Sequence, residues 1–388
     1  MECVPCLQCS RAVTDAGRTA RRLLAVGVMS VSLAVTAQAD DEAIDARPSV
    51  APDIRDDDTD LKLQKGNFVV VPIPISNPTL DTGLVAGAAY FYPQTPEQQE
   101  AQPASVTAAA AMYTTTDSRA AAIVQQNYWR ENRWRFTGAL GAADLRLSLR
   151  TQDEDNGTES TDWRISGKFF FTRLSRKITG NWYGGVFARS IDANQSLESG
   201  DESLDFDTED VRSVGVGLIA EYDSRDLPIN TYSGRHFKFQ ALFNDEAIGS
   251  KDSYQSYDTS FRSYHELSDS VVLAWELLGC QREGTVPLWD SCFIKLRGFS
   301  VTDYLGKSSL SAQAEIRWRL GKRWGVVAFG GGGKIDESFS GLGEGASTPS
   351  YGVGLRFSVL PAKRVNMRLD YAKSRDSDAI HFSVGEAF

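Results

Sequence analysis

Ser309–Leu320, which reads SLSAQAEIRWRL, alternates apolar and polar side chains from one residue to the next. Leucine, alanine, isoleucine and tryptophan hold the even-numbered positions, and serine, glutamine, glutamate and arginine hold the odd-numbered ones. Successive side chains of a β-strand point to opposite faces of its sheet. The stretch therefore predicts a strand with one apolar and one charged face, and Ser350–Val359 and Arg364–Tyr371 repeat the pattern.

Alternation alone fits a soluble β-sandwich as well as a membrane barrel, because both bury one face of each strand. Charged side chains inside the strands favour the barrel, since a wet lumen accepts them. Aromatic residues such as Trp129, Trp134 and Trp324 recur at strand ends, as in an interfacial girdle. We therefore predict an all-β fold, a transmembrane antiparallel β-barrel whose closure satisfies every backbone polar group in lipid.

Sixteen strands are predicted, an even number as single-chain bacterial barrels require. Their ranges are 81–92, 104–115, 118–129, 133–140, 142–151, 162–172, 181–192, 211–223, 234–246, 254–267, 270–280, 309–320, 325–335, 349–359, 364–373 and 378–388. The count depends on splitting 133–151 in two. The alternative keeps that stretch whole and makes Gly66–Ile75 a strand, although Pro72 and Pro74 disfavour a regular ladder.

Chain parity assigns the connections to two sides of the membrane. The turns at 174–180, 224–233, 321–323 and 360–362 are predicted to face the periplasm. The long segments 193–210, 281–308 and 336–348 are predicted to face outside.

The N-terminus has the features of a removable export signal, predicted at residues 1–39. Basic residues up to Arg22 precede an apolar run from Leu23 to Val35, and Ala37-Gln38-Ala39 offers a cleavage site. The run is too short to span a bilayer as a helix. Residues 40–65 are acidic and poor in apolar side chains, so we expect a disordered lead there and the barrel at 66–388.

Three of the five cysteines lie within residues 3–9, in a C-x2-C-x2-C spacing that resembles a metal or cluster site. They precede the cleavage site and would be discarded with the signal. Cys280 and Cys292 remain, and a pair in an exported chain predicts a disulfide. Two unpaired thiols are the alternative.

The charge balance excludes nucleic acid as a partner. Removing residues 1–39 removes four basic and two acidic residues, which leaves 37 basic and 49 acidic residues and a net charge of −12. A nucleic-acid-binding face would be basic.

Four motifs follow one another in the second half of the chain. They are Glu221-Tyr222-Asp223-Ser224-Arg225-Asp226 with Pro228 and Gly234, Leu296-Arg297-Gly298-Phe299, Ala314-Glu315-Ile316-Arg317, and the terminal Phe388. Together they resemble the BamA/TamA superfamily, also called the bacterial surface antigen family, over residues 211–388. The resemblance implies a barrel in the outer membrane of a Gram-negative bacterium that inserts or translocates other polypeptides. Many relatives carry periplasmic POTRA domains, for which residues 40–65 leave no room, so a short form is expected.

The resemblance also implies how the outside loop 281–308 is held. In the family this loop folds back into the lumen, and the arginine of the Arg297-Gly298-Phe299 string contacts acidic groups on the inner wall. Glu315 matches the first acidic partner, and Gly331 stands where the second is expected, so another lumen acid such as Asp370 is the candidate replacement. A guanidinium suits this role because its rigid fork donates paired hydrogen bonds to carboxylates.

Two more groups of residues take their expected roles from the resemblance. The periplasmic turn signature, for which a structural role is expected, comprises Asp223, Arg225, Asp226, Pro228 and Gly234. The C-terminal signal that the barrel assembly machinery reads during biogenesis comprises Phe382, Val384 and Phe388.

No enzyme activity, cofactor or metal is expected. The sequence has no G-x-S-x-G, H-E-x-x-H or P-loop motif, and its three histidines lack a Ser/Asp arrangement at recognisable spacing. Expected partners are outer-membrane lipids and lipopolysaccharide, the barrel assembly machinery and an unknown polypeptide client. The alternative function is a passive pore, or a barrel that serves as a surface binding or structural protein.

Overall fold

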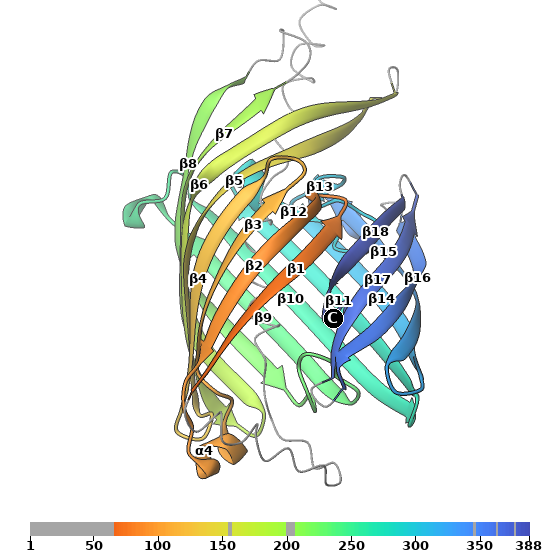
Figure 1. The fold of residues 1–388 in the computed structure, drawn as a ribbon. Helices are drawn as coiled ribbons and strands as arrows, with labels where there is room; N and C mark the ends of the chain where they lie inside the picture. Colours follow the sequence, from red (N-terminus) through yellow and green to blue (C-terminus); the bar gives the residue numbers. More distant parts are fainter. Residues whose placement is uncertain (1–65, 154–156, 199–205, 344–346, 362–363, 376–377) are drawn as a thin grey trace, which may run out of the picture.

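Sixteen strands pair edge to edge into a closed antiparallel barrel in the computed structural model (Figure 1). The structure describes residues 66–153, 157–198, 206–343, 347–361, 364–375 and 378–388; the predicted signal and acidic lead lie outside these ranges. The all-β class and the number of barrel strands are confirmed. None of the helices in the described ranges is long and apolar enough to cross a membrane.

The barrel strands are β1 (Asn67–Asn77), β2 (Asp81–Phe91), β3 (Val106–Thr114), β4 (Arg119–Trp129), β5 (Trp134–Asp153), β6 (Gly157–Thr179), β7 (Trp182–Glu198), β8 (Phe206–Asp223), β9 (Gly234–Asn244), β10 (Tyr254–Ser268), β11 (Val271–Gly284), β14 (Ser308–Leu320), β15 (Trp324–Asp336), β16 (Thr348–Leu360), β17 (Val365–Ser374) and β18 (Asp378–Val384). A separate two-stranded sheet contains β12 (Cys292–Phe293) and β13 (Leu305–Gly306). The helices are α4 (Pro96–Ala101) and the 3-10 turns η2 (Glu246–Ile248), η3 (Leu288–Asp290) and η4 (Gly341–Gly343).

The alternation in Ser309–Leu320 becomes the two faces of β14. Ile316 and Trp318 are about half exposed on the outer surface, whereas Glu315 and Arg317 are buried on the inner side. The connections after β6, β8, β14 and β16 lie at one end of the barrel, which we call the turn end, and those after β7, β11 and β15 lie at the other, the loop end. This division agrees with the grouping that chain parity predicted.

The predicted division of 133–151 into two strands is wrong, and the alternative holds: β5 is continuous and β1 covers most of Gly66–Ile75. The predicted break between 133–140 and 142–151 fell at Gly141, which lies inside β5. In the structure it marks a close approach, since a Cβ there would lie 2.5 Å from the carbonyl oxygen of Ala121.

The connection between β2 and β3 contains α4, although no helix was expected after Gly66. Six residues are too few to show helical periodicity in the sequence, and the local signal is a capping box instead. The Thr95 side chain accepts from the Gln98 backbone N–H, and the Gln98 side chain accepts from the Thr95 N–H.

Strands β5–β8 extend past their neighbours at the loop end (Figure 1). Along this extension the inner face is apolar and the outer face is charged, the reverse of the pattern in β14. Leu145, Trp163 and Ile191 face inward and are almost fully buried, while Asp144 and Arg164 form a 2.8 Å ion pair on the outer face. Lipid would not accept this outer face, so the extension stands beyond the bilayer and has a core like that of a soluble protein.

We predict that Gly141→Val destabilises the barrel, whereas Gly87→Val is tolerated. Both glycines belong to one cross-strand row, but a Cβ at Gly87 would meet nothing closer than Val71 at 3.7 Å. Overpacking of this kind costs about 1–3 kcal/mol. The measurement is the temperature at which the folded, fast-migrating gel band is lost; equal temperatures for the two variants would contradict the close approach at Gly141.

Candidate functional site

The connection between β11 and β14, residues 285–307, folds into the barrel lumen and carries β12 and β13. Its apolar residues Ile294, Leu296 and Phe299 are buried as one cluster. A Cβ at Gly333, on the inner face of β15, would lie 2.6 Å from Ile294 Cγ2. The missing side chain at Gly333 therefore makes room for the segment, which we call the lumen loop.

Arg297 of the lumen loop reaches the wall with every nitrogen of its guanidinium group. Nη2 lies 2.6 Å from Glu315 Oε2, Nη1 lies 2.9 Å from Asp370 Oδ2, and Nε donates to Gln313 Oε1 at 2.7 Å. The guanidinium carbon stacks 3.5 Å from the centre of the Phe329 ring. All these groups are buried, so each charge depends on its partners for solvation.

The second carboxylate comes from Asp370 on β17, because position 331 cannot hold a side chain. A Cβ at Gly331 would lie 2.3 Å from the carbonyl oxygen of Ala312 on the neighbouring strand. Asp370 occupies the lumen face three strands away from β14, and it takes the place that an acid on β15 was expected to fill.

These contacts belong to a longer chain of alternating charges, the ion-pair chain: Arg317, Glu315, Arg297, Asp370, Arg356 and Glu386. It has three cations and three anions and is therefore neutral overall. It connects β14, the lumen loop, β17 and β16 to the C-terminal residues. Neutrality and mutual hydrogen bonding allow so many charges to be buried together.

Two neighbours of Arg297 fix the backbone of the loop. Gly298 has a φ of +94°, which favours glycine, and its N–H donates to His381 Nε2 at 3.2 Å. The Ser350 hydroxyl donates to the Arg297 carbonyl oxygen. Phe299 packs edge-on against Tyr304, with 5.7 Å between ring centres.

A second attachment, which the sequence analysis missed, holds the other part of the lumen loop. Asp290 accepts from Arg189, from the Tyr254 hydroxyl at 3.0 Å and from Ser256 at 3.2 Å, and it lies 3.5 Å from Arg282 Nη2. These partners come from β7, β10 and β11. Burial opposes ionisation of Asp290, but the arginines hold its pKa below the ordinary value.

Trp289, next to Asp290, inserts into the apolar cluster formed by the extension of β5–β8 and is fully buried. A disulfide joins Cys280 on β11 to Cys292 on β12, as expected for this pair, and ties the loop to its own strand. The lumen loop is thus attached to both sides of the barrel.

The predicted turn signature lies where β8 passes into β9 at the turn end. Asp223 holds Arg225 through both carboxylate oxygens, at 3.0 and 3.2 Å, and Asp226 holds Arg364 at 2.5 Å. Gly234 has a φ of +113°, and a Cβ there would lie 2.3 Å from the Ser224 carbonyl oxygen. Pro228 lies in the same connection. These contacts brace the turn against β17 and support the structural role.

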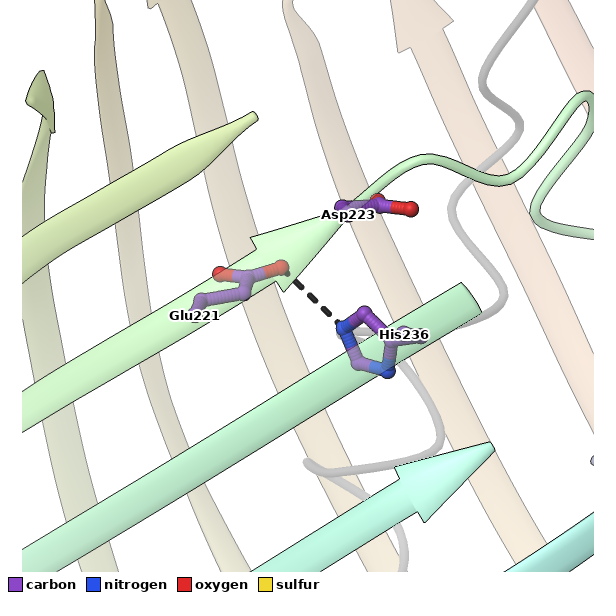
Figure 2. A group of neighbouring side chains, drawn as sticks. All are labelled: Glu221, Asp223 and His236. Carbon is purple, nitrogen blue, oxygen red and sulfur yellow. Dashed lines mark hydrogen bonds and ion pairs between the residues drawn. The ribbon is translucent and has the colours of Figure 1, made fainter. Parts of the chain in front are cut away.

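Glu221, Asp223 and His236 converge beside this turn and could offer ligand atoms to a metal ion, all within 4.8 Å of one another (Figure 2). His236 Nε2 lies 3.3 Å from Glu221 Oε1. However, guanidinium groups already face both carboxylates: Arg135 Nη1 lies 3.6 Å from Glu221, and Arg225 grips Asp223. A cation would have to displace two arginines, so the group fits an internal ion-pair cluster better than a metal site.

The predicted C-terminal signal is divided between two faces. Phe382 and Val384 share the outer face with Leu369, the register partner of Phe382. β18 ends at Val384, not at Phe388, because Gly385 has a φ of +95° and turns the chain inward. The Phe388 carbonyl oxygen accepts from Arg317 Nη2 at 2.6 Å inside the lumen.

The fold and site define a class: a closed 16-stranded barrel whose longest loop is locked inside its lumen through an arginine. The Omp85 superfamily domain matches residues 102–388, and the chain therefore belongs to the Omp85 superfamily of bacterial outer-membrane barrels. The resemblance inferred from the motifs is thus confirmed.

Solved structures share the fold. The structure of BamA from Haemophilus ducreyi lacking POTRA domains 1–3 matches with a TM-score of 0.54 and 11% identity, covering 91% of this chain and 77% of that one. CdiB from Acinetobacter baumannii matches with a TM-score of 0.54 and 13% identity, covering 83% and 60%. CdiB from Escherichia coli matches with a TM-score of 0.53 and 12% identity, covering 81% and 61%, so the chain spans less than two thirds of either CdiB. A search of curated proteins finds no match.

We predict that Arg297→Ala and Glu315→Ala each release the lumen loop, because each leaves a buried partner charge uncompensated, at a cost of about 3–5 kcal/mol. Limited proteolysis between residues 286 and 307 measures the release. The double variant should be little worse than either single variant, since both remove one interaction. Arg146→Ala is the control, because its ion pair with Asp117 is exposed. Additive effects of the two substitutions would mean that they do not act through one anchor.

We predict that Asp290→Asn exposes the same loop at neutral pH and that the difference from the unmodified protein vanishes in acid. A lowered pKa means that the stabilisation is present above the ordinary aspartate pKa of about 3.9 and is lost as the pH falls through the lower folded-state value. Proteolysis at a series of pH values with an acid-stable protease measures it. A difference that persists at the lowest pH would show that the Asp290 charge is not the cause.

Proposed function

We propose that the protein inserts or secretes a polypeptide client at the outer membrane of a Gram-negative bacterium, by opening its wall between β1 and β18. The observation that carries this proposal is the weakness of that seam. β1 pairs with β2 along its whole length, from Asn67 to Asn77, but its register with β18 contains a single pair, Ser76 with Phe382.

Two features of the strands account for the weak seam. Pro72 and Pro74 have no N–H group, so β1 cannot complete ladders on both edges. Continuing the Ser76–Phe382 register would place Phe388 opposite Val70, but the chain turns inward at Gly385 instead. The edge of β1 from Val70 to Ile73 therefore extends beyond Val384, where β18 ends, and has no register partner there in the described chain.

The C-terminal residues are held away from β1 by the ion-pair chain. Glu386 lies 2.6 Å from Arg356 Nε and also accepts from Asn366, and Arg317 holds Phe388. An open strand edge is a template for pairing with another extended polypeptide, which supplies the matching hydrogen bonds. This edge chemistry suits a client strand, and BamA and CdiB have the same fold.

The proposal includes an orientation and partners. The turn end faces the periplasm and the loop end faces outside, lipopolysaccharide and phospholipid surround the barrel, and the assembly machinery reads Phe382, Val384 and Phe388. A passive pore fits the geometry less well, because the lumen loop is attached to both walls.

Joining β1 to β18 by an engineered disulfide, which we call the seam lock, tests the proposal. Ser76→Cys with Phe382→Cys places two thiols at register partners, and Ala88→Cys with Ala109→Cys is the matched control across the intact β2–β3 pair. We expect deletion of the gene and oxidation of the seam pair to remove the same proteins from the outer membrane or the medium, and reductant to restore them. The oxidised control pair should change nothing.

Two results would contradict this function. A seam-locked protein that supports a normal set of outer-membrane and secreted proteins, where the deletion does not, would exclude the seam as the route. A deletion that changes no protein but removes ion conductance from purified membranes would establish the pore instead.

A further inference from the structure

The inner face of β1–β5, on one side of the seam, is apolar, in contrast to the polar wall expected around a water-filled lumen. Three cross-strand rows run from β1 to β5, and residues in one row lie on one face because they are register partners. The rows are Val69, Ala89, Ala108, Val124 and Ala139; Val71, Gly87, Ala110, Ala122 and Gly141; and Ile73, Val85, Met112, Ala120 and Ala143.

These rows face the lumen, since Val85, Met112 and Ala120 pack in one cluster with Trp289 of the lumen loop. The wall on the other side of the seam, from β14 to β17, carries the ion-pair chain. The lumen is therefore divided into an apolar side and a charged side. Leaving the apolar side in water would cost free energy in proportion to its exposed area.

The two outer rows are covered by the protein itself. At the loop end, Val85 and Ala120 lie under Trp289 and Val301; at the turn end, Val69 and Ala89 pack on the cluster of Phe91, Ala104 and Val106. We call the middle row the apolar strip; it consists of Val71, Gly87, Ala110, Ala122 and Gly141.

The apolar strip is a shallow, accessible hollow. The side chain of Val71 is 42% exposed although it faces inward, and a Cβ at Gly87 would meet only Val71 within 4 Å. Glycine and alanine fill the next three positions, and the Phe169 ring covers the far end at Gly141, where a Cβ would lie 2.6 Å from it. The four uncovered positions, on strands about 4.8 Å apart, give the strip an accessible length of about 14 Å, which suits part of an extended hydrocarbon chain.

The strip is continuous with the lipid-facing exterior. β1 is apolar on both faces: Phe68 and Val70 are more than 60% exposed on the outside, while Val71 and Ile73 face inward. The β1 edge between these faces has a single register pair with β18. A hydrocarbon chain that passes this edge leaves lipid and reaches the strip without crossing a polar surface.

We propose that the apolar strip binds an acyl chain of a membrane lipid, which enters sideways through the seam and fills the apolar side of the lumen. The headgroup stays at the membrane interface, since nothing in the strip could replace its hydration. The proposal uses the same seam as the proposed function but requires no polypeptide client. Either proposal can therefore fail while the other stands.

Site-specific photo-crosslinking in vesicles tests the site. The purified full chain is reconstituted in dioleoyl phosphatidylethanolamine and phosphatidylglycerol, with a photoreactive amino acid at Val71, at Val70 or at Gln240. Val70 is the adjacent lipid-facing position, and Gln240 lies on the inner face of β9, which it shares with the buried His236. We expect lipid adducts at Val70 and Val71, and at least tenfold fewer at Gln240, by mass spectrometry.

The seam lock then tests the route. In the Ser76→Cys and Phe382→Cys background, oxidation before reconstitution from lipid-free detergent should lower the Val71 adduct at least fivefold and leave the Val70 adduct unchanged. Heat-modifiable migration establishes that each variant is folded. If the Val71 variant is not folded, Ala110 and its outward-facing neighbour Ala109 replace Val71 and Val70 in the same comparison.

Three results would overturn the proposal. Equal labelling of Val71 and Gln240 would mean that lipid enters the lumen without a site. A crosslink from Val71 to another part of the same chain would mean that the protein covers its own strip. Peptide adducts at Val71 in cells, with no lipid adduct in vesicles, would assign the strip to a polypeptide.

Discussion

The contact between Arg297 and Glu315 joins the lumen loop to the charged wall of the barrel. Glu315 is fixed in β14, whereas Arg297 belongs to the lumen loop, so their pairing holds the part of the loop around Arg297 against the wall. The pair is buried and is therefore held only as long as its neighbours stay in place. Through Asp370 and Arg356 these neighbours extend to Glu386, near the free end of the chain. The loop in the lumen and the residues beside the seam are thus parts of one electrostatic unit.

The division of the lumen into two sides follows from this unit. The carboxylates and guanidinium groups that the barrel wall contributes to the ion-pair chain lie on β14–β17 and compensate one another, whereas β1–β4, on the other side of the seam, contribute glycine, alanine and valine. The charged side holds the loop and the C-terminal residues by hydrogen bonds of fixed geometry. The apolar side has no such directional contacts, so it can bind a partner without breaking hydrogen bonds. The apolar surface is therefore the better suited of the two to the part of the wall that is proposed to open.

Much of the fold could be predicted from local patterns. The alternation in Ser309–Leu320 indicates which side chains of β14 face inward, and this places Glu315 and Arg317 correctly without any three-dimensional information. The motif around Arg297 indicated its partner because the resemblance supplied it. Asp290 could not be found in the same way, since Arg189 and Tyr254 lie 101 and 36 residues away from it in the sequence. The division of 133–151 was wrong, and the close approach of Gly141 to Ala121 that keeps β5 continuous there depends on the neighbouring strand, which the local sequence does not reveal.

The unequal length of the strands has a mechanical consequence. β5–β8 are 17 to 23 residues long, whereas β1–β4 have 9 to 11. Bending stiffness between neighbouring strands rises with the number of backbone hydrogen bonds that join them. We therefore expect β5–β8 to be the more rigid part of the wall and β1–β4 to be the more flexible part, with the border between β4 and β5 as the hinge. In the proposed opening of the seam, we expect β1–β4 to move more than β5–β8, to which Arg189 attaches the lumen loop.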